Sequence, residues 1–239
     1  MIKKEIIPNT TLDSIGVDTD WEEKVQLFVE NMYLYKSAIQ QINTKLEILD
    51  NDFKVKNDYN PIHHIESRIK TPESIIQKAL RKNLSFSDSW KDNITDIAGI
   101  RVICNYKEDV YSISKQLLKQ EDITLLKEKD YILHPKESGY KALHLIIETP
   151  VYLTNSVEHV PVEIQIRTIA MDTWASLEHE LKYKNKNGLD EKTIKKLKRC
   201  ATKLSEIDQE LQDIHNEQFL SQESSTKSYS VNTLLLELL

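Results

Sequence analysis

The chain has 239 residues, of which 39% are hydrophobic and 29% charged, with only 4 Gly and 6 Pro. This composition excludes collagen-like, low-complexity and proline-rich linker proteins, and the length suits one sizeable α/β domain with helical additions. The formal net charge of −6 argues against broad, sequence-independent binding to nucleic acid, which requires a basic face.

No segment contains the run of about 18 apolar residues that a membrane span requires. The start of the chain also lacks the pattern of a secretory signal. The sequence therefore predicts a cytoplasmic protein that does not span a membrane. Its two cysteines, Cys104 and Cys200, cannot form a disulfide framework, and we expect both to be buried thiols.

Residues 1–19 show no periodic pattern and are expected to form a flexible lead-in. From Asp20, apolar residues recur at intervals of three and four, which predicts a long amphipathic helix with Asp20 as its cap. The apolar face of this helix consists of Trp21, Val25, Phe28, Met32, Tyr35, Ile39, Ile42, Leu46 and Leu49. We expect it to pack against the protein's own core, with a contact between copies as the alternative.

Shorter elements follow from Asn60, and the first helix among them is marked by Thr71 at its cap and Pro72 at its first position. The predicted strands are residues 63–70, 94–105, 123–133, 141–148 and 157–167. The predicted helices are residues 72–83, 106–119, 168–183 and 190–219. The sequence thus predicts an α/β (α+β) fold with a mixed sheet of about five strands surrounded by helices.

The last predicted helix mirrors the first in its length and in its apolar pattern. One face of it carries Ile194, Leu197, Ala201, Leu204, Ile207, Leu211 and Ile214. We expect residues 20–219, including both terminal helices, to form one domain. Residues 220–239 are then a tail of unknown role.

The strand over 157–167 alternates apolar and polar side chains with period two. Glu163, Gln165 and Arg167 share its polar side. A carboxylate, an amide and a guanidinium therefore lie on one surface, although an ordinary half-solvated sheet face would show the same alternation.

A second candidate surface lies in the segment 139–147, where Tyr140, Ala142 and His144 share one side. An aromatic ring and an imidazole beside a small residue leave room for a planar ligand, on which Tyr140 could stack. Taken singly, the tyrosine could equally pack in the core and the histidine could form a structural hydrogen bond.

Asp96 lies just before a predicted strand, where a carboxylate can hold Mg²⁺ while substrate phosphates complete its coordination. Gly99 permits the close approach of a ligand, and Arg101 can stack on a base or bind a phosphate. Asp96 together with Glu163 on a facing strand is the usual content of a two-carboxylate metal site for phosphoryl transfer.

Arg68 and Lys70 share one side of a strand that leads into a helix start carrying Ser74 and, one turn later, Lys78. Free N–H groups and cations at a helix start can hold a phosphate without a glycine-rich loop. The chain has none of the glycine-rich nucleotide-binding loops. A further group of lysines, which could equally be solvated surface, consists of Lys127, Lys129, Lys136 and Lys141.

Four motifs, in this order along the chain, resemble the synthetase domain of the RelA/SpoT homologue family and, more narrowly, the small alarmone synthetases. The motifs are Arg68-Ile-Lys-Thr-Pro-Glu-Ser-Ile75, Asp96-Ile-Ala-Gly-Ile-Arg101, Lys136-Glu-Ser-Gly-Tyr-Lys-Ala-Leu-His144 and Glu163-Ile-Gln-Ile-Arg-Thr168. Each motif alone is weak, but four in order are specific, and the resemblance covers roughly residues 20–215.

The resemblance implies a single-domain, nucleotidyltransferase-like synthetase that transfers pyrophosphate from ATP to the 3′-hydroxyl of GTP or GDP. The products would be pppGpp or ppGpp and AMP, the alarmones of the stringent response. The family also implies a Mg²⁺ cofactor and a homotetramer assembled through the terminal helices. Long family members carry a hydrolase domain that does not fit in this chain, so we expect no hydrolase activity.

The resemblance further assigns roles to residues. Asp96 and Glu163 would hold Mg²⁺, and Glu163 would take the proton from the ribose 3′-hydroxyl. The ATP-binding residues would be Arg68, Lys70, Ser74, Lys78, Arg101 and Lys129, with the two arginines sandwiching adenine. The residues binding GTP or GDP would be Lys136, Tyr140, Lys141, His144, Gln165 and Asp172, with Tyr140 stacked on guanine and Asp172 accepting its N–H groups.

Three alternatives stay open from the sequence. A toxin that pyrophosphorylates the 3′ end of tRNA would use the same Asp96, Glu163 and Arg101, and the negative net charge argues mildly against it. Synthesis of ppApp from an adenine acceptor is a second variant. A non-catalytic nucleotide-sensing module is the third, and it would have no need of both carboxylates.

Overall fold

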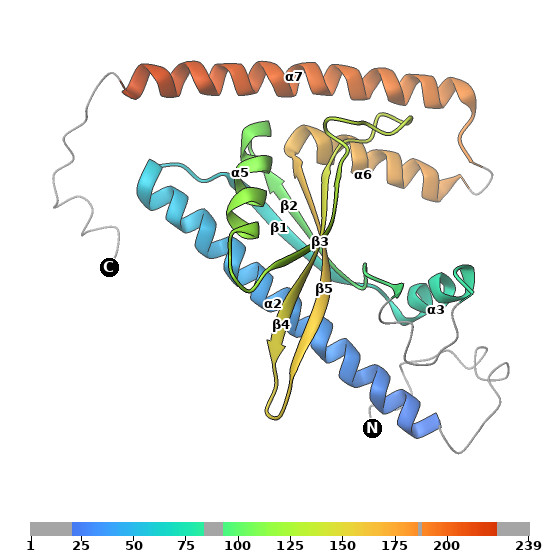
Figure 1. Ribbon diagram of the computed structural model, residues 1–239. Coiled ribbons are helices and arrows are strands. Elements are labelled where there is room, and N and C mark those ends of the chain that lie inside the picture. Colours follow the sequence, from blue (N-terminus) through green and yellow to red (C-terminus); the bar gives the residue numbers. More distant parts are fainter. Residues whose placement is uncertain (1–20, 84–92, 186–187, 224–239) are drawn as a thin grey trace.

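The computed structural model describes residues 21–83, 93–185 and 188–223. Its centre is a five-stranded mixed sheet with the strand order β1-β2-β5-β4-β3 (Figure 1). The strands are β1 (Ile62–Ile69), β2 (Ala98–Cys104), β3 (Thr124–Asp130), β4 (Leu143–Tyr152) and β5 (Val157–Thr168). Only β2 and β5 pair in parallel, and the other three pairings are antiparallel. The predicted mixed sheet with surrounding helices is confirmed.

The described helices are α2 (Trp21–Asn57), α3 (Pro72–Arg81), α5 (Lys107–Leu118), α6 (Ile169–Lys184) and α7 (Glu191–Glu223). Thr71 caps α3 as predicted, because its side chain accepts a hydrogen bond from the backbone N–H of Ser74. The first predicted helix continues past Leu49 to Asn57. Its proposed cap, Asp20, lies outside the described residues, as do the lead-in and most of the tail.

One face of the sheet forms the hydrophobic core against α2 and α5. Ile42 and Leu46 of α2 are fully buried in one cluster with the inward side chains of β2, β4 and β5, such as Val102, Leu145 and Ile164. Burying one such aliphatic side chain contributes about 1.5–3 kcal/mol to the free energy of unfolding, so this layer stabilises the packing of the helices on the sheet. The opposite face keeps the polar residues of the alternating strands.

The helix α6 begins directly after β5, and α7 packs across α6 and α5 (Figure 1). The inward side of α7 is largely polar, because Asp208 and Gln212 are buried there. Four members of the predicted apolar stripe are instead exposed, namely Ile194, Ile207, Leu211 and Ile214. The helix therefore docks through hydrogen bonds as much as through apolar contact.

The expectation of two buried thiols is half wrong. Both cysteines are unpaired, but Cys104 is buried in β2 whereas Cys200 is exposed on α7. Separately, none of the described helices combines the length and the hydropathy that crossing a membrane would need.

Candidate active site

The register of the sheet places polar side chains of five strands in one row across its open face. Glu66 lies opposite Arg101, Arg101 opposite Gln165, Gln165 opposite His144, and His144 opposite Lys129. Residues that pair directly across strands point to the same side of a sheet. Side chains that are far apart in the sequence therefore meet on a single surface.

A second row runs beside the first. Arg68 lies opposite Gly99, and Gly99 lies opposite Glu163. A Cβ added at Gly99 would lie 3.6 Å from Arg68 Cγ. Because glycine has no side chain, the surface between Arg68 and Glu163 is left uncovered. The close approach of a ligand that was predicted at Gly99 would therefore take place between Arg68 and Glu163.

The second row and the part of the first row on β1, β2 and β5 line a pocket with an empty volume of about 450 Å³, part of which is open to solvent. Its walls are Glu66, Ser67, Arg68, Asp96, Gly99, Ile100, Arg101, Glu163 and Gln165. Five residues that the sequence analysis singled out as site residues thus share one pocket. Three carboxylates, two guanidiniums and an amide line this pocket. The guanidiniums suit a phosphorylated ligand with an aromatic base, and the carboxylates suit a cation bound with it.

Asp96 is held by two lysines at one end of this pocket. Its Oδ2 lies 2.7 Å from Lys70 Nζ and 2.6 Å from Lys78 Nζ. Burial raises the pKa of Asp96, but the hydrogen bonds and charges of the two lysines outweigh it and lower the pKa below its usual value. Asp96 is therefore ionised at neutral pH. The two lysines beside it are placed where they could also bind an anionic ligand. Ser74, at the start of the same helix as Lys78, bonds locally to Thr71.

The second carboxylate, Glu163, receives contacts on both of its oxygens. Gln165 Nε2 donates to Oε2 at 3.0 Å, and His144 Nδ1 lies 3.6 Å from Oε1. His144 and the Gln165 amide lower the pKa of Glu163, against its burial and the negative charge of Asp96, which raise it. The two carboxylates line the same pocket.

These carboxylates fit a magnesium ion. The Oδ1 atom of Asp96 is buried and has no hydrogen-bond partner among the described residues. Within the described part of the chain, no group of three or more His, Cys, Asp or Glu side chains could enclose a metal. Mg²⁺ is typically bound by one or two carboxylates, with waters and substrate phosphates as its remaining ligands. The donor set therefore suits a metal that arrives with a nucleotide.

An aromatic corner lies next to His144. The hydroxyl of Tyr140 is 2.6 Å from His144 Nε2. Lys136 Nζ lies 4.7 Å from the centre of the Tyr140 ring and 4.6 Å from that of Tyr131. Tyr131 also contacts the ring of His144 edge-on. Tyr131 was not predicted as a site residue, because an isolated tyrosine in a predicted strand has no motif around it.

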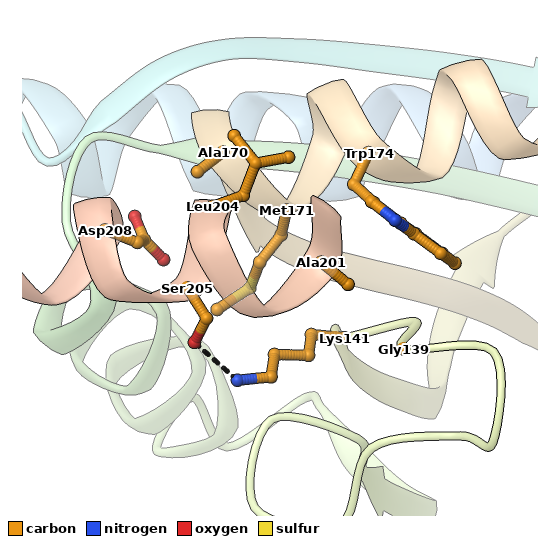
Figure 2. A pocket seen from close by; sticks show the side chains of 9 residues that line it. All are labelled: Gly139, Lys141, Ala170, Met171, Trp174, Ala201, Leu204, Ser205 and Asp208. Carbon is orange, nitrogen blue, oxygen red and sulfur yellow. Dashed lines mark hydrogen bonds between the residues drawn. The ribbon is translucent and has the colours of Figure 1, made fainter. Parts of the chain in front are cut away.

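Lys141 and Asp172, which were expected to bind the acceptor, also have partners within the protein. Lys141 points away from the pocket to α7, where its Nζ donates to Ser205 Oγ at 2.6 Å (Figure 2). Burial and the nearby charge of Lys107 lower the pKa of Lys141. Asp172 Oδ1 accepts a hydrogen bond from Arg167 at 3.0 Å and lies 3.6 Å from Arg101 Nε.

The cavity around Lys141 lies between α6, α7 and the loop before β4 (Figure 2). It is lined by Gly139, Lys141, Ala170, Met171, Trp174, Ala201, Leu204, Ser205 and Asp208. Gly139 has a φ of +95°, and a Cβ there would lie 2.6 Å from the Cβ of Ala201. The loop that carries Tyr140 is thus fastened to α7 on its other side.

Two further site residues were not assigned a role from the sequence. Glu66 accepts a hydrogen bond from Arg101 at 2.9 Å. It could have been predicted as a site residue, because it lies two residues before Arg68 and so points to the same side of the strand. Arg167 belongs to a motif and to the polar side of β5, yet its buried hydrogen bonds could not be inferred from that alternation.

The chain is also similar to proteins that are already known. Residues 67–188 match the family model described as a region found in RelA / SpoT proteins. The chain is 42% identical over 199 residues to the GTP pyrophosphokinase YwaC of Bacillus subtilis, covering 83% of this chain and 91% of that protein.

Two solved structures from Bacillus subtilis resemble the fold. Small alarmone synthetase 2 matches with a TM-score of 0.71 and 44% identity, over 77% of this chain and 97% of that one. Small alarmone synthetase 1, bound to its product pppGpp, matches with a TM-score of 0.74 and 33% identity, over 80% of this chain and 98% of that one.

Proposed function

The chain belongs to the family of RelA and SpoT proteins, and from this membership and the site geometry we propose that it is a small alarmone synthetase. It transfers the pyrophosphate of ATP to the 3′-hydroxyl of GTP or GDP, giving pppGpp or ppGpp and AMP. The observation that carries the proposal is the single pocket that joins Asp96 and Glu163 to Arg68 and Arg101.

The donor nucleotide occupies the side of the pocket formed by β1, α3 and β2. Arg68 and Arg101 lie on the same sheet face and hold the adenine between them, since guanidinium groups stack well on planar bases. Lys70 and Lys78, which neutralise Asp96 without substrate, bind the phosphates. Ser74 at the start of α3 adds a phosphate contact. Lys129 lies on β3 at the opposite edge of the sheet, so its proposed role in ATP binding requires the phosphate chain to extend across the pocket.

The acceptor nucleotide occupies the side formed by β4, β5 and the loop before β4. Tyr140 stacks on the guanine, while Lys136, His144 and Gln165 surround the ribose and phosphates. Asp172 is proposed to accept the guanine N–H groups, for which it would turn from Arg167 towards the base. Lys141 supports this side from α7, and a direct contact with the acceptor would require it to leave Ser205.

In the reaction, the 3′-oxygen of the acceptor forms a bond to the β-phosphorus of ATP as the bond to the α–β bridging oxygen breaks. Glu163 accepts the hydroxyl proton. Because its pKa is lowered, Glu163 is a weak base, and most of the rate comes from positioning and charge neutralisation. Asp96 and Glu163 would hold Mg²⁺, which when bound neutralises charge on the transferred phosphates.

We also propose a homotetramer that works in the cytoplasm, where both nucleotides are available. Apolar side chains on the outside of both terminal helices support assembly through these helices. They include Tyr33, Ile48 and Val55 of α2 and Ile207, Leu211 and Ile214 of α7. Light scattering should give four times the mass of the chain, and a monomer mass would exclude this assembly.

The activity is tested by incubating the protein with Mg²⁺ and γ-labelled ATP and, in parallel, with GTP, GDP, no further acceptor or deacylated tRNA. We expect label in pppGpp or ppGpp, and its loss in Glu163→Gln. Glu158→Gln is the matched control, because Glu158 lies exposed on the same strand outside the pocket. Label found only in tRNA, or in no acceptor, would refute the proposed function.

A further inference from the structure

Arg167 has an unusual environment for a basic residue. Its exposure is 4%, and among the described residues it is the one basic side chain that is buried. A buried charge has to be paired and hydrogen-bonded, and the terminal nitrogens of Arg167 have three partners, whereas its Nε has none among the described residues. Arg167 donates to Asp172 Oδ1 at 3.0 Å, to the Tyr140 hydroxyl at 2.8 Å and to Gln165 Oε1 at 2.6 Å. Little of its surface is left for a nucleotide.

The contact with Gln165 determines the orientation of that amide. A guanidinium can only donate hydrogen bonds, so the Gln165 atom that faces Arg167 has to be the oxygen. The amide nitrogen then points the other way and donates to Glu163 Oε2 at 3.0 Å. Arg167 thereby ensures that Glu163 Oε2 faces the N–H donor of the Gln165 amide and not its oxygen.

The contact with Tyr140 has the same effect along a second path. The Tyr140 oxygen accepts from Arg167, and its one proton is free to point at His144 Nε2, 2.6 Å away. Burial raises the pKa of Tyr140, which keeps that proton in place. With Nε2 accepting, a neutral His144 carries its proton on Nδ1, which faces Glu163 Oε1 at 3.6 Å.

We propose that Arg167 is a positioning residue that orients one N–H group towards each oxygen of Glu163, through Gln165 on one side and through Tyr140 and His144 on the other. The proposal rests on the proposed function, because it concerns the group that accepts the hydroxyl proton. Without Arg167, the Gln165 amide can flip and the Tyr140 hydroxyl can turn, so Glu163 loses its fixed orientation. Misplacing a reacting group by about 1 Å can reduce a rate about 100-fold.

The test measures kcat at saturating ATP and GTP for Arg167→Met and for variants that interrupt the path through Tyr140 and the path through Gln165. Tyr140→Phe keeps the stacking ring but removes the hydroxyl, and Gln165→Met removes the amide. We expect Arg167→Met to lower kcat about 100-fold. In the double variant that lacks both paths, Arg167→Met should lower kcat by less than about twofold more, because the two routes to Glu163 are already gone.

A merely structural role predicts a different outcome, with a full further loss when Arg167→Met is added to the double variant. That result, or a wild-type kcat in Arg167→Met, would overturn the inference. Arg167→Lys serves as the second variant, since it keeps the charge beside Asp172 and should lose about tenfold in kcat.

The control variant is Asp50→Ala, which removes hydrogen bonds to the Ile62 N–H and to Asn60 on the far side of the sheet. It should lower the melting temperature without changing kcat. Equilibrium binding of a non-hydrolysable ATP analogue gives the folded fraction of each variant. If the wild-type protein makes no alarmone, the proposed function fails, whereas normal wild-type activity with an unaffected Arg167→Met variant refutes only the positioning role.

Discussion

The contact between Gly139 and α7 predicts a measurable coupling between helix docking and acceptor binding. Gly139 has a φ of +95°, and an added Cβ would lie 2.6 Å from Ala201 Cβ, closer than real carbon atoms approach. Gly139→Ala therefore carries a backbone penalty of about 1–2 kcal/mol for the left-handed region. Overpacking against α7 adds about 1–3 kcal/mol. We expect the free energy of unfolding to fall by about 2–5 kcal/mol.

Gly188 provides a matched control for the backbone term. Its φ is +82°, but a Cβ there would meet no atom within 4 Å. Gly188→Ala should therefore cost about 1–2 kcal/mol alone. The difference between the two variants isolates the clash with Ala201.

The assay combines denaturant unfolding with the KM values for GTP and ATP. Because Gly139 adjoins Tyr140, Gly139→Ala should raise the KM for GTP while leaving that for ATP within about twofold. Adding Ala201→Gly should recover the overpacking term, less about 1 kcal/mol for glycine in a helix. Equal losses for Gly139→Ala and Gly188→Ala, or no recovery with Ala201→Gly, would refute this reasoning.

Three further predictions concern single carboxylates. Asp96→Asn should lower kcat at least about 100-fold, because it removes a proposed metal ligand and the negative charge that pairs with Lys70. Initial rates above a tenth of wild type would contradict this. Glu66→Gln should raise the KM for ATP a few-fold with kcat retained, because Arg101 loses a charged partner, and an unchanged KM would count against it. Burial raises the pKa of Asp109 to about 6, so this group favours the folded state at low pH and destabilises it as the pH rises from about 4 to about 6, by at most about 3 kcal/mol. Asp109→Asn should flatten that part of the stability profile in unfolding experiments at several pH values.

Local interactions made much of the site predictable. The alternation along β5 depends only on the period-two geometry of a strand, and it correctly assigned Glu163 and Gln165 to the polar side. The start of α3 was predictable for the same reason, since Thr71 caps the helix through an atom three residues away. The ion pairs of Lys70 and Lys78 with Asp96 were not predicted, because they join segments that are distant in the chain.

Partners across the fold could not be predicted in this way. The sequence alone determined which residues face the same side of each strand, because side-chain direction within one element is a property of its backbone. The tertiary structure decided that Lys141 bonds to α7, that α7 turns Asp208 inward and Ile207 outward, and that Arg167 joins Asp172 in a buried pair. Those choices depend on strand order and helix docking, where the free energy of a contact is shared among elements distant in the chain.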